Sequence, residues 1–545
     1  MLIFLLAAVG CSEPQGTLFQ WKPPDFRVKG TYYFQPQAAI NTFWSSFDFE
    51  QCKVDFAQLR DDGFNTIILF IPWGVFQPTV NPVSYNERAF MELDGVVRLA
   101  DSFGLKVALR LGTHDHIPRD AGGAKWLAAT VMTDEVEWVA YRDLFREVAA
   151  RTKAHSNLLF LFWTFEDTGY TPDLWFHQYP ENVAAFRQWL HRRPLWWWNW
   201  LWWEDNASYE TVEPPNQNEP PLKGMKLRAF LEFSDQLTAR RLPDPCAAAK
   251  QGNPQAAVSF QPRAEINWRH DYSLQFELPP CYSFVTTWFS PYQSYIFGDE
   301  SKELDGKRTA SYVPRYLKRT EKLSRGLPVF VDQFNFQHFG GHPEEGALKT
   351  EDEQLKFIAN GLPPLLRDSL GYALWNYYDY YLNVINNGSF RFGLAEWETP
   401  SQDGLVQLNL SSAKDGEAVN IQPGGFVRQK IGVYNDQEYT LDFQARGLEP
   451  GAYVRVVIRF LPDVGSLDKA IAVGSQMEPL RVQVKTPPNS ADLSITFLAQ
   501  KGGLAVQIKD VMFYPWMDTG GIYDVEGRPR IELRDLFRQM NALVP

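Results

Sequence analysis

Residues 158–167 read Leu-Leu-Phe-Leu-Phe-Trp-Thr-Phe-Glu-Asp, an apolar run that ends in two carboxylates. Residues 66–71 form a second such run, Thr-Ile-Ile-Leu-Phe-Ile. A strand that is apolar on both of its faces requires burial on both faces. A parallel sheet covered by helices on each side provides that burial. These two stretches therefore predict an α/β fold built on a parallel sheet.

The same unit recurs along the chain, because short apolar runs alternate with segments of helical periodicity. The predicted strands span residues 28–34, 65–71, 105–111, 158–165, 256–261, 283–288, 328–333 and 371–376. The clearest helices span residues 48–62, 87–103, 134–154, 222–241 and 351–366. Eight such units predict a (β/α)8 barrel with its active site at the C-terminal ends of the strands. A doubly wound open sheet is the alternative, although no GxGxxG or GxxxxGK motif follows any predicted strand.

The chain changes character after residue 400. Alternating strands separated by Gly, Pro and Asn turns, with no helix between them, predict a jelly-roll-like β-sandwich. An amphipathic helix over residues 531–543 follows it. Because the eighth barrel strand has no helix before the sandwich, we expect this last helix to close the barrel around an inserted sandwich. The alternative is that it docks on the sandwich alone. The predicted division is a leader over 1–25, a barrel over 26–400, a sandwich over 401–516 and a closing segment over 517–545.

The composition excludes some classes of partner. The chain of 545 residues carries 53 Lys and Arg against 65 Asp and Glu, a formal net charge of −12. Without a basic block, a nucleic-acid partner is not expected. No apolar run reaches about 18 residues, so no membrane-spanning helix is expected. Aromatic residues make up 15%, and such rings suit either sugar ligands or core packing.

The N-terminus resembles a bacterial lipoprotein signal. Met1–Val9 is apolar, and Gly10, Cys11 and Ser12 follow. This pattern predicts an exported, membrane-anchored lipoprotein in the periplasm or on the cell surface, with Cys11 lipidated. The usual Lys or Arg before the apolar run is missing, so an ordinary signal peptide and a misassigned start stay open. The oligomeric state is also open.

Three further cysteines occur, at positions 52, 246 and 281. Their odd number and the lack of a CxxC motif argue against a disulfide framework and a cysteine zinc site. Cys246 and Cys281 either pair in an oxidising compartment or remain buried thiols like Cys52.

Glu166 is the first candidate catalytic residue, because it directly follows the apolar run of the fourth strand. Partial burial at a barrel mouth favours the protonated form of a carboxylate, which suits a general acid. Hydrolysis of a glycosidic bond requires a second carboxylate on the other side of the bond.

The order of barrel, strand-four Glu, aromatic mouth and appended sandwich resembles the retaining glycoside hydrolases of clan A. Residues 182–190, the Trp-rich run after them and residues 208–215 are similar to glycoside hydrolase family 42 and its β-galactosidase-like relatives. The resemblance implies that Glu166 is the acid/base and that a Glu at the end of strand seven is the nucleophile. It also implies that Trp375, beside Asn376, stacks on the substrate, and it implies no cofactor.

The sequence departs from that pattern at two positions. Phe165 stands where the clan has Asn, and Gln333 stands at the nucleophile position. An amide is a very poor nucleophile. Asp332, one residue earlier, is one candidate to replace the missing nucleophile. Strand alternation without a bulge would, however, point its side chain away from the mouth.

The amide at position 333 leaves three further alternatives open. The protein is an engineered Glu→Gln variant, or it binds sugar without cleaving it, or a more distant acid replaces the nucleophile. The acids considered for that last role are Asp115, Asp167 and Asp379.

Further residues near strand ends are candidates for substrate binding. They are Arg110, His114, Trp288 and Tyr292. His114 and His116 also suggest a metal-dependent deacetylase, but His-x-His alone is a weak metal motif and no third ligand stands out.

The Trp-rich run over 196–203 contains too many rings to point inward together, which favours a groove, a subunit contact or a lipid surface. Residues 427–431, 437–443 and 506–511 resemble carbohydrate-binding modules of the jelly-roll type. The sandwich is therefore either sugar-binding or a structural brace.

Together these features predict a glycoside hydrolase that cleaves O-glycosidic bonds in a β-linked oligo- or polysaccharide by acid/base catalysis. The alternative is a non-catalytic saccharide-binding or polysaccharide-assembly lipoprotein on an inactive barrel.

Overall fold

The computed structural model describes twelve stretches of the chain. They are residues 23–112, 116–121, 130–164, 179–215, 224–262, 278–289, 306–324, 326–334, 338–339, 350–409, 417–462 and 464–543.

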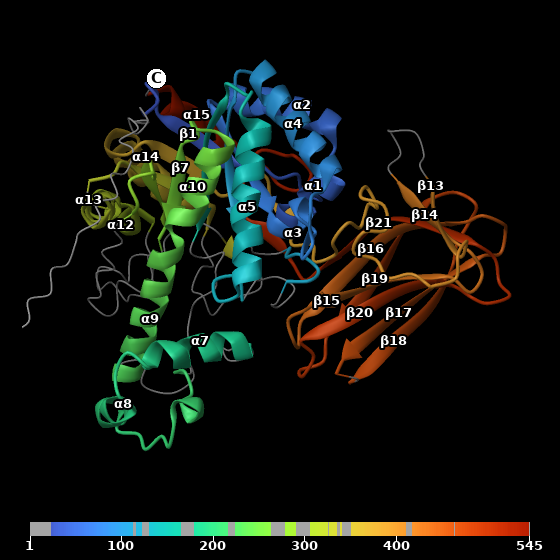
Figure 1. Ribbon diagram of the computed structural model, residues 1–545. Coiled ribbons are helices and arrows are strands. Elements are labelled where there is room, and N and C mark those ends of the chain that lie inside the picture. The colour runs from blue at the N-terminus through green and yellow to red at the C-terminus, as the bar shows by residue number, and fades with distance from the viewer. Residues whose placement is uncertain are drawn as a thin grey trace, which may run out of the picture.

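Within these residues, eight parallel strands close into a barrel surrounded by helices (Figure 1). The strands are β1 (Val28–Tyr32), β2 (Thr66–Pro72), β5 (Lys106–Gly112), β6 (Leu158–Thr164), β7 (Val258–Gln261), β8 (Phe284–Phe289), β9 (Val329–Phe334) and β11 (Gly371–Leu374). All eight match predicted strands. Because β1 pairs with both β2 and β11, the sheet has no edge, and the open-sheet alternative is wrong.

Strand alternation divides the apolar side chains of the barrel into two clusters. The inner cluster includes Tyr32, Phe70, Phe160 and Phe330. The outer cluster joins the strands to the helices around them. Every residue of β2 is buried, as its apolar sequence required.

The predicted helices are present, and each begins within three residues of its predicted start. They are α2 (Phe49–Asp61), α4 (Glu87–Ser102), α5 (Glu135–Thr152), α9 (Met225–Arg241) and α14 (Glu351–Asp368). The side chains of Asp48, Asn86 and Asp134 accept hydrogen bonds from backbone N–H groups in the first turns of α2, α4 and α5. Two further helices, α10 (Pro243–Gly252) and α13 (Val313–Leu323), were not predicted.

The β-rich part consists of two antiparallel sheets. One contains β13 (Val406–Asn409), β14 (Ala418–Ile421), β21 (Val506–Tyr514), β16 (Glu438–Gly447) and β19 (Glu478–Lys485). The other contains β15 (Phe426–Gly432), β20 (Asp492–Ala499), β17 (Tyr453–Leu461) and β18 (Gly465–Ala472). The strands predicted for this part span 406–410, 439–443, 454–460, 480–484, 493–497 and 506–513. β14 and β18 were not among them, and the edge strand β18 has no buried face and therefore no alternating pattern.

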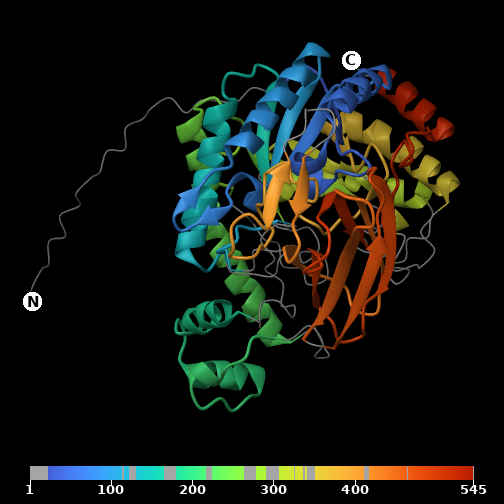
Figure 2. The ribbon, with the colours of Figure 1, turned by 90° about the vertical axis from the view of Figure 1, so that its right-hand side faces the viewer.

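The last helix, α15 (Ile531–Ala542), packs on the barrel rather than on the sandwich. The ring of Phe537 stacks on Tyr372 of β11 and lies 5.7 Å from the ring of Phe64. The hydroxyl of Tyr372 donates to Asn541 Oδ1 over 2.7 Å. The chain therefore leaves the barrel after β11, forms the sandwich and returns, as Figure 2 shows for the sandwich and the C-terminal helix.

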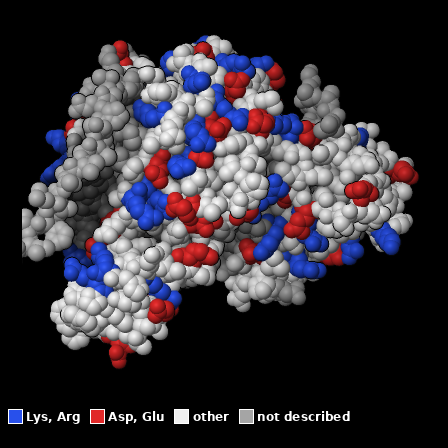
Figure 3. Space-filling model, in the orientation of Figure 1, with Lys and Arg blue, Asp and Glu red and all other residues white. Residues whose placement is uncertain are grey.

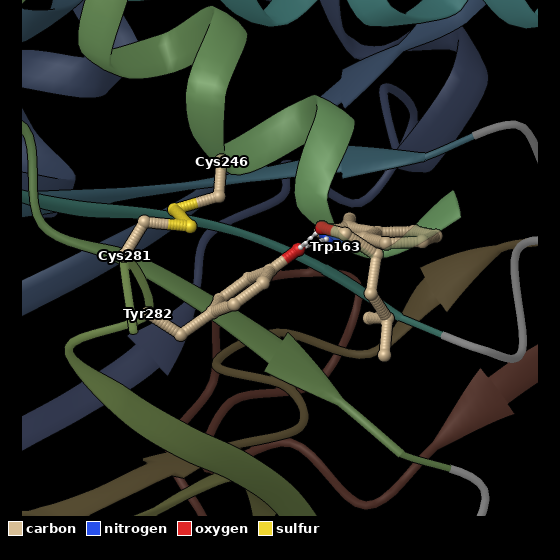
Figure 4. The surroundings of a disulfide bond; sticks show 5 residues. Trp163, Cys246, Cys281 and Tyr282 are labelled. Atoms are coloured by element: carbon tan, nitrogen blue, oxygen red, sulfur yellow. Dashed lines mark hydrogen bonds between the residues drawn. A yellow bond between two sulfur atoms is a disulfide. The ribbon is translucent and has the colours of Figure 1, made fainter. Parts of the chain in front are cut away.

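A disulfide joins Cys246 of α10 to Cys281, which precedes β8 (Figure 4). Beside it, Trp163 Nε1 donates to the hydroxyl of Tyr282 over 3.0 Å. The alternative of three buried thiols is therefore wrong for this pair. Cys52 is the free cysteine among the described residues, and its burial raises the pKa of the thiol to about 12.

The disulfide predicts a measurable stability difference. It spans a sequence separation of 35 residues, and closing such a loop in the unfolded chain corresponds to about 3 to 4 kcal/mol. We expect the Cys246→Ser/Cys281→Ser double variant to lose about that much free energy of unfolding in urea. Reductant should shift the transition of the parent and leave that of the double variant unchanged. If reductant leaves the unfolding transition of the parent unchanged, the prediction is wrong.

The Trp-rich run forms a lobe with its neighbours at the far end of α9 (Figures 1 and 2). It lies in α8 (Leu195–Trp202), which follows α7 (Pro180–Leu190). Trp198 is buried, whereas Trp196, Trp200 and Trp203 are exposed. Figure 3 shows this lobe as a largely uncharged surface. No helix in the described parts of the chain is long and apolar enough to cross a membrane.

Candidate active site

Asp332 of β9 points into the barrel. Phe330 belongs to the inner cluster and Val331 to the outer one, so alternation brings Asp332 inward. The register of β9 then shifts against both neighbouring strands, and Phe334 faces outward again. The bulge follows Asp332 rather than turning it. The expectation that Asp332 points away was therefore wrong, because it took the wrong residue of β9 as facing inward.

Both carboxylate oxygens of Asp332 accept hydrogen bonds inside the barrel. The hydroxyl of Tyr32 on β1 donates to Oδ2 over 3.2 Å. The amide of Gln261 on β7 donates to Oδ1 over 3.0 Å. All three side chains are buried, with Asp332 itself 0% exposed. A carboxylate at this depth is held in one orientation and shielded from water.

Arg110 of β5 extends this network across the barrel. One of its guanidinium nitrogens lies 3.4 Å from the hydroxyl of Tyr32, and the other lies 3.2 Å from Thr164 Oγ1. Arg110 donates to Tyr32, and Tyr32 donates to Asp332, so the three groups form a polarised chain between opposite charges. The guanidinium also lies 5.3 Å from the ring of Phe70.

Two predicted aromatic residues lie at the same end of the barrel. The ring of Trp375, directly after β11, lies 4.5 Å from Tyr32 and 5.5 Å from Phe34. Trp288 is partly exposed and pairs in register with Gln333 across β8 and β9. Because Thr287 contacts Tyr316 outside the barrel, alternation places Trp288 on the inner side.

Gln333 lies within β9, and Asn376 lies in the turn that follows β11. Gln333 occupies the bulge and is partly exposed. Asn376 is fully buried, and its amide nitrogen bonds to the backbone carbonyl of Tyr378. The amide nitrogen of Asn376 therefore braces the turn after β11, while its Oδ1 has no hydrogen-bond partner among the described residues.

Asp379 is not available as a second catalytic acid. Arg530 donates to its two oxygens over 2.6 and 3.1 Å, and the backbone N–H groups of Gly520 and Gly521 donate to Oδ1. The carboxylate is 1% exposed. Asp379 therefore ties the segment before α15 to the barrel.

Several predicted residues lie outside the described residues. They are Cys11, His114, Asp115, Glu166, Asp167 and Tyr292. No group of three metal-ligating side chains occurs among the residues that are described. His116, which is described, lies in a separate cavity beside Glu396.

Sequence reasoning missed Tyr32, Gln261 and Thr164. Each is a polar residue at or close to the C-terminal end of a predicted strand. A search for buried polar residues at strand ends would have found them.

The fold and this polar network define a closed parallel (β/α)8 barrel with a carboxylate on its seventh strand and an added antiparallel β-rich region. No protein-family model matches the chain, and no curated protein matches its sequence.

Solved structures similar to this chain include a mannosidase, a GH5_18 protein and a β-galactosidase, all at low identity. The exo-β-1,4-mannosidase Op5Man5 from Opitutaceae bacterium strain TAV5 is 15% identical over 65% of this chain and 52% of its own, with a TM-score of 0.42. A GH5_18 protein from Streptomyces cattleya, solved with GlcNAc, is 15% identical over 65% of this chain and 72% of its own, with a TM-score of 0.41. The β-galactosidase from Marinomonas ef1 is 12% identical over 64% of this chain and 54% of its own, with a TM-score of 0.45. The chain thus spans about half the length of the mannosidase and the galactosidase.

Proposed function

We propose that this protein is a glycoside hydrolase that acts on a β-linked oligo- or polysaccharide. Glu166 is the proton donor and Asp332 is the second carboxylate. The observation that carries the proposal is the inward orientation of Asp332, held by Tyr32 and Gln261 at the end of the barrel where β6 leads toward Glu166.

The surroundings of Asp332 suit this chemistry. A sugar acetal develops positive charge as its bond breaks, and a fixed carboxylate stabilises that charge. The hydroxyl of Tyr32 holds the carboxylate on one side, and Arg110 polarises that hydroxyl. Trp375, beside Tyr32, supplies an aromatic face for a sugar ring.

The proton-donor role predicts a leaving-group effect in Glu166→Gln. We expect kcat on a methyl β-glycoside to fall by about 10²-fold or more, because an alkoxide leaving group requires protonation. The kcat on a 4-nitrophenyl β-glycoside should fall much less, because nitrophenolate leaves unprotonated. Stopped assays on β-mannosides, β-galactosides and β-glucosides measure both. If kcat falls equally on the two kinds of substrate, Glu166 is not the proton donor.

A second candidate is a saccharide-binding protein on an inactive barrel, favoured by Gln333 at the end of strand seven. Binding and turnover assays on the unsubstituted protein decide between the hydrolase and the saccharide-binding protein. Saccharide binding without turnover on any of these glycosides would support the binding protein.

We also propose that the chain is exported, with Cys11 as the lipidation site. The Cys246–Cys281 disulfide supports export, because such bonds persist in oxidising compartments. Metabolic labelling with a fatty acid tests the anchor, and Cys11→Ser should abolish the label.

A further inference from the structure

Helix α13 carries a stripe of positive charge. It contains four cationic residues and one acidic residue, Glu321, in a chain whose net charge is −12. The four cationic residues are spaced i, i+3, i+4 and i+7, which places them along one face of the helix: Arg315, Lys318, Arg319 and Lys322. The other face is buried through Val313, Tyr316, Leu317 and Thr320. Helical spacing therefore gathers cations on the surface that do not form a continuous basic block in the sequence.

A cavity of about 450 Å³ lies beside this stripe, at the base of the barrel. Its lining comes from the residues around the starts of β1, β9 and β11 and from the last turns of α13 and α14. Because the strands of a parallel barrel begin at the base and end at the mouth, the cavity lies at the opposite end from the candidate active site. Figure 1 shows α13 on the side of the barrel away from the sandwich. The charged residues of the lining are Arg27, Lys318, Glu321, Arg367 and Asp368.

The base keeps an excess of positive charge around this cavity. Arg367 donates to both oxygens of Asp368 over 2.8 and 2.6 Å, so one of the two acids of the lining is already paired. This hydrogen bonding holds the pKa of Asp368 below its usual value, and the charges of Lys318 and Arg27 add to the effect. Lys318 and Lys322 are exposed, and neither forms an ion pair with a described carboxylate. Both ammonium groups therefore face solvent, where an anionic partner can reach them.

The N-terminal part of the chain indicates which anionic partner this is. Arg27 lines the cavity, and Cys11, the proposed lipidation site, precedes it in the same chain. A fully extended chain from Cys11 to Arg27 spans at most about 55 Å. A lipid on Cys11 therefore holds the base within that distance of a membrane surface. Anionic lipids attract cations at such a surface, and an acyl chain combined with a basic patch attaches a protein more stably than either alone.

We infer that the base patch, which consists of Arg27, Lys318 and Lys322, docks on an anionic phospholipid surface. The choice of a membrane over a soluble polyanion rests on the proposed lipidation of Cys11, and nothing in the inference depends on the proposed hydrolysis. Docking at the base turns the candidate active site away from the membrane, toward a polysaccharide in solution. Because salt screens attraction between exposed charges, the docking weakens as ionic strength rises.

Sedimentation of the full chain with vesicles tests the inference. The readout is the affinity for vesicles of equal parts phosphatidylglycerol and phosphatidylcholine, divided by the affinity for phosphatidylcholine alone. The apolar residues 1–9 affect both affinities alike, so the ratio isolates the contribution of charge. We expect Lys318→Gln/Lys322→Gln to lower this ratio by about 20-fold, since each cation at an anionic surface contributes about 5-fold. Lys469→Gln/Lys501→Gln is the matched control, because it removes two exposed lysines from the sandwich and should keep the ratio of the parent.

Glu321→Gln tests the opposite sign, which a loss of fold cannot imitate. Removal of this carboxylate from the cavity lining should raise the ratio by about 5-fold. An equal fall in the two double variants, or a parent without preference for phosphatidylglycerol, overturns the inference. Binding of the parent to polygalacturonate but not to the vesicles also overturns it, because the patch then serves a soluble polyanion.

Docking and lipidation fail separately. Fatty-acid labelling reports on Cys11, whereas the vesicle ratio reports on the base patch. A labelled Cys11 without preference for phosphatidylglycerol removes only the docking. A preference that is lost in Lys318→Gln/Lys322→Gln, in a chain that takes up no label, supports the docking and removes only the anchor.

Discussion

Asp332→Asn is expected to lower kcat on a 4-nitrophenyl β-glycoside by about 10³-fold, with KM changed only a few-fold. The substitution keeps the shape of the side chain and removes its charge. The Gln261 amide still has an oxygen to donate to, so the barrel interior stays packed. The developing positive charge on the sugar then has no anion opposite it, and the loss falls on the transition state rather than on binding.

Gln333→Glu is the informative companion to this variant. If Asp332 is the second carboxylate, a new acid at the partly exposed bulge position adds little, and kcat should change less than about 10-fold. A large gain in Gln333→Glu, together with near-normal activity in Asp332→Asn, would contradict our assignment. It would mean that the residue at the bulge holds the nucleophile position. Circular dichroism and thermal melting of each variant separate a loss of activity from a loss of fold.

Arg530→Met is expected to give the largest loss of stability, about 3–5 kcal/mol of unfolding free energy. The substitution leaves the Asp379 carboxylate, which is 1% exposed, without its cationic partner. Two backbone N–H groups still donate to Asp379, but they do not neutralise a buried charge. Urea unfolding followed by tryptophan fluorescence measures the loss.

Arg528→Met is the matched control, because Arg528 lies two residues away and pairs with Asp524 at the exposed surface. Its unfolding transition should stay close to that of the parent. Adding Asp379→Asn to Arg530→Met should restore part of the lost stability, because the neutral amide removes the buried charge. An unchanged transition in Arg530→Met would contradict the stabilising role of the Arg530–Asp379 ion pair.

The barrel was predictable because its strands carry their own signal. A run such as Thr66–Ile71 is apolar at every position, and burial on both faces is the reason. The edge strand β18 lacks such a signal, since its side chains are almost all outside the core. The pairing of Cys246 with Cys281 depends on which elements meet in space, which spacing along the chain does not specify.

The candidate site was predictable only in part, for the same reason. Arg110 was found because it stands near the end of a strand with a strong pattern, and Trp375 was found through the resemblance to clan A glycoside hydrolases. The inward orientation of Asp332 follows from alternation along β9, but which residues of β9 face inward is seen only when Phe330 lies in the inner cluster and Val331 in the outer one. Its partners Tyr32 and Gln261 come from β1 and β7, and only closure of the barrel brings them together.

The position of α15 after the sandwich has a consequence for biosynthesis. During translation the sandwich emerges whole while the barrel still lacks one of its outer walls, because Phe537 and Asn541 are made after the sandwich. Folding in order from the N-terminus, usual for chains of several domains, is therefore interrupted here. The nascent barrel keeps an apolar flank at Phe64 and Tyr372 uncovered until then.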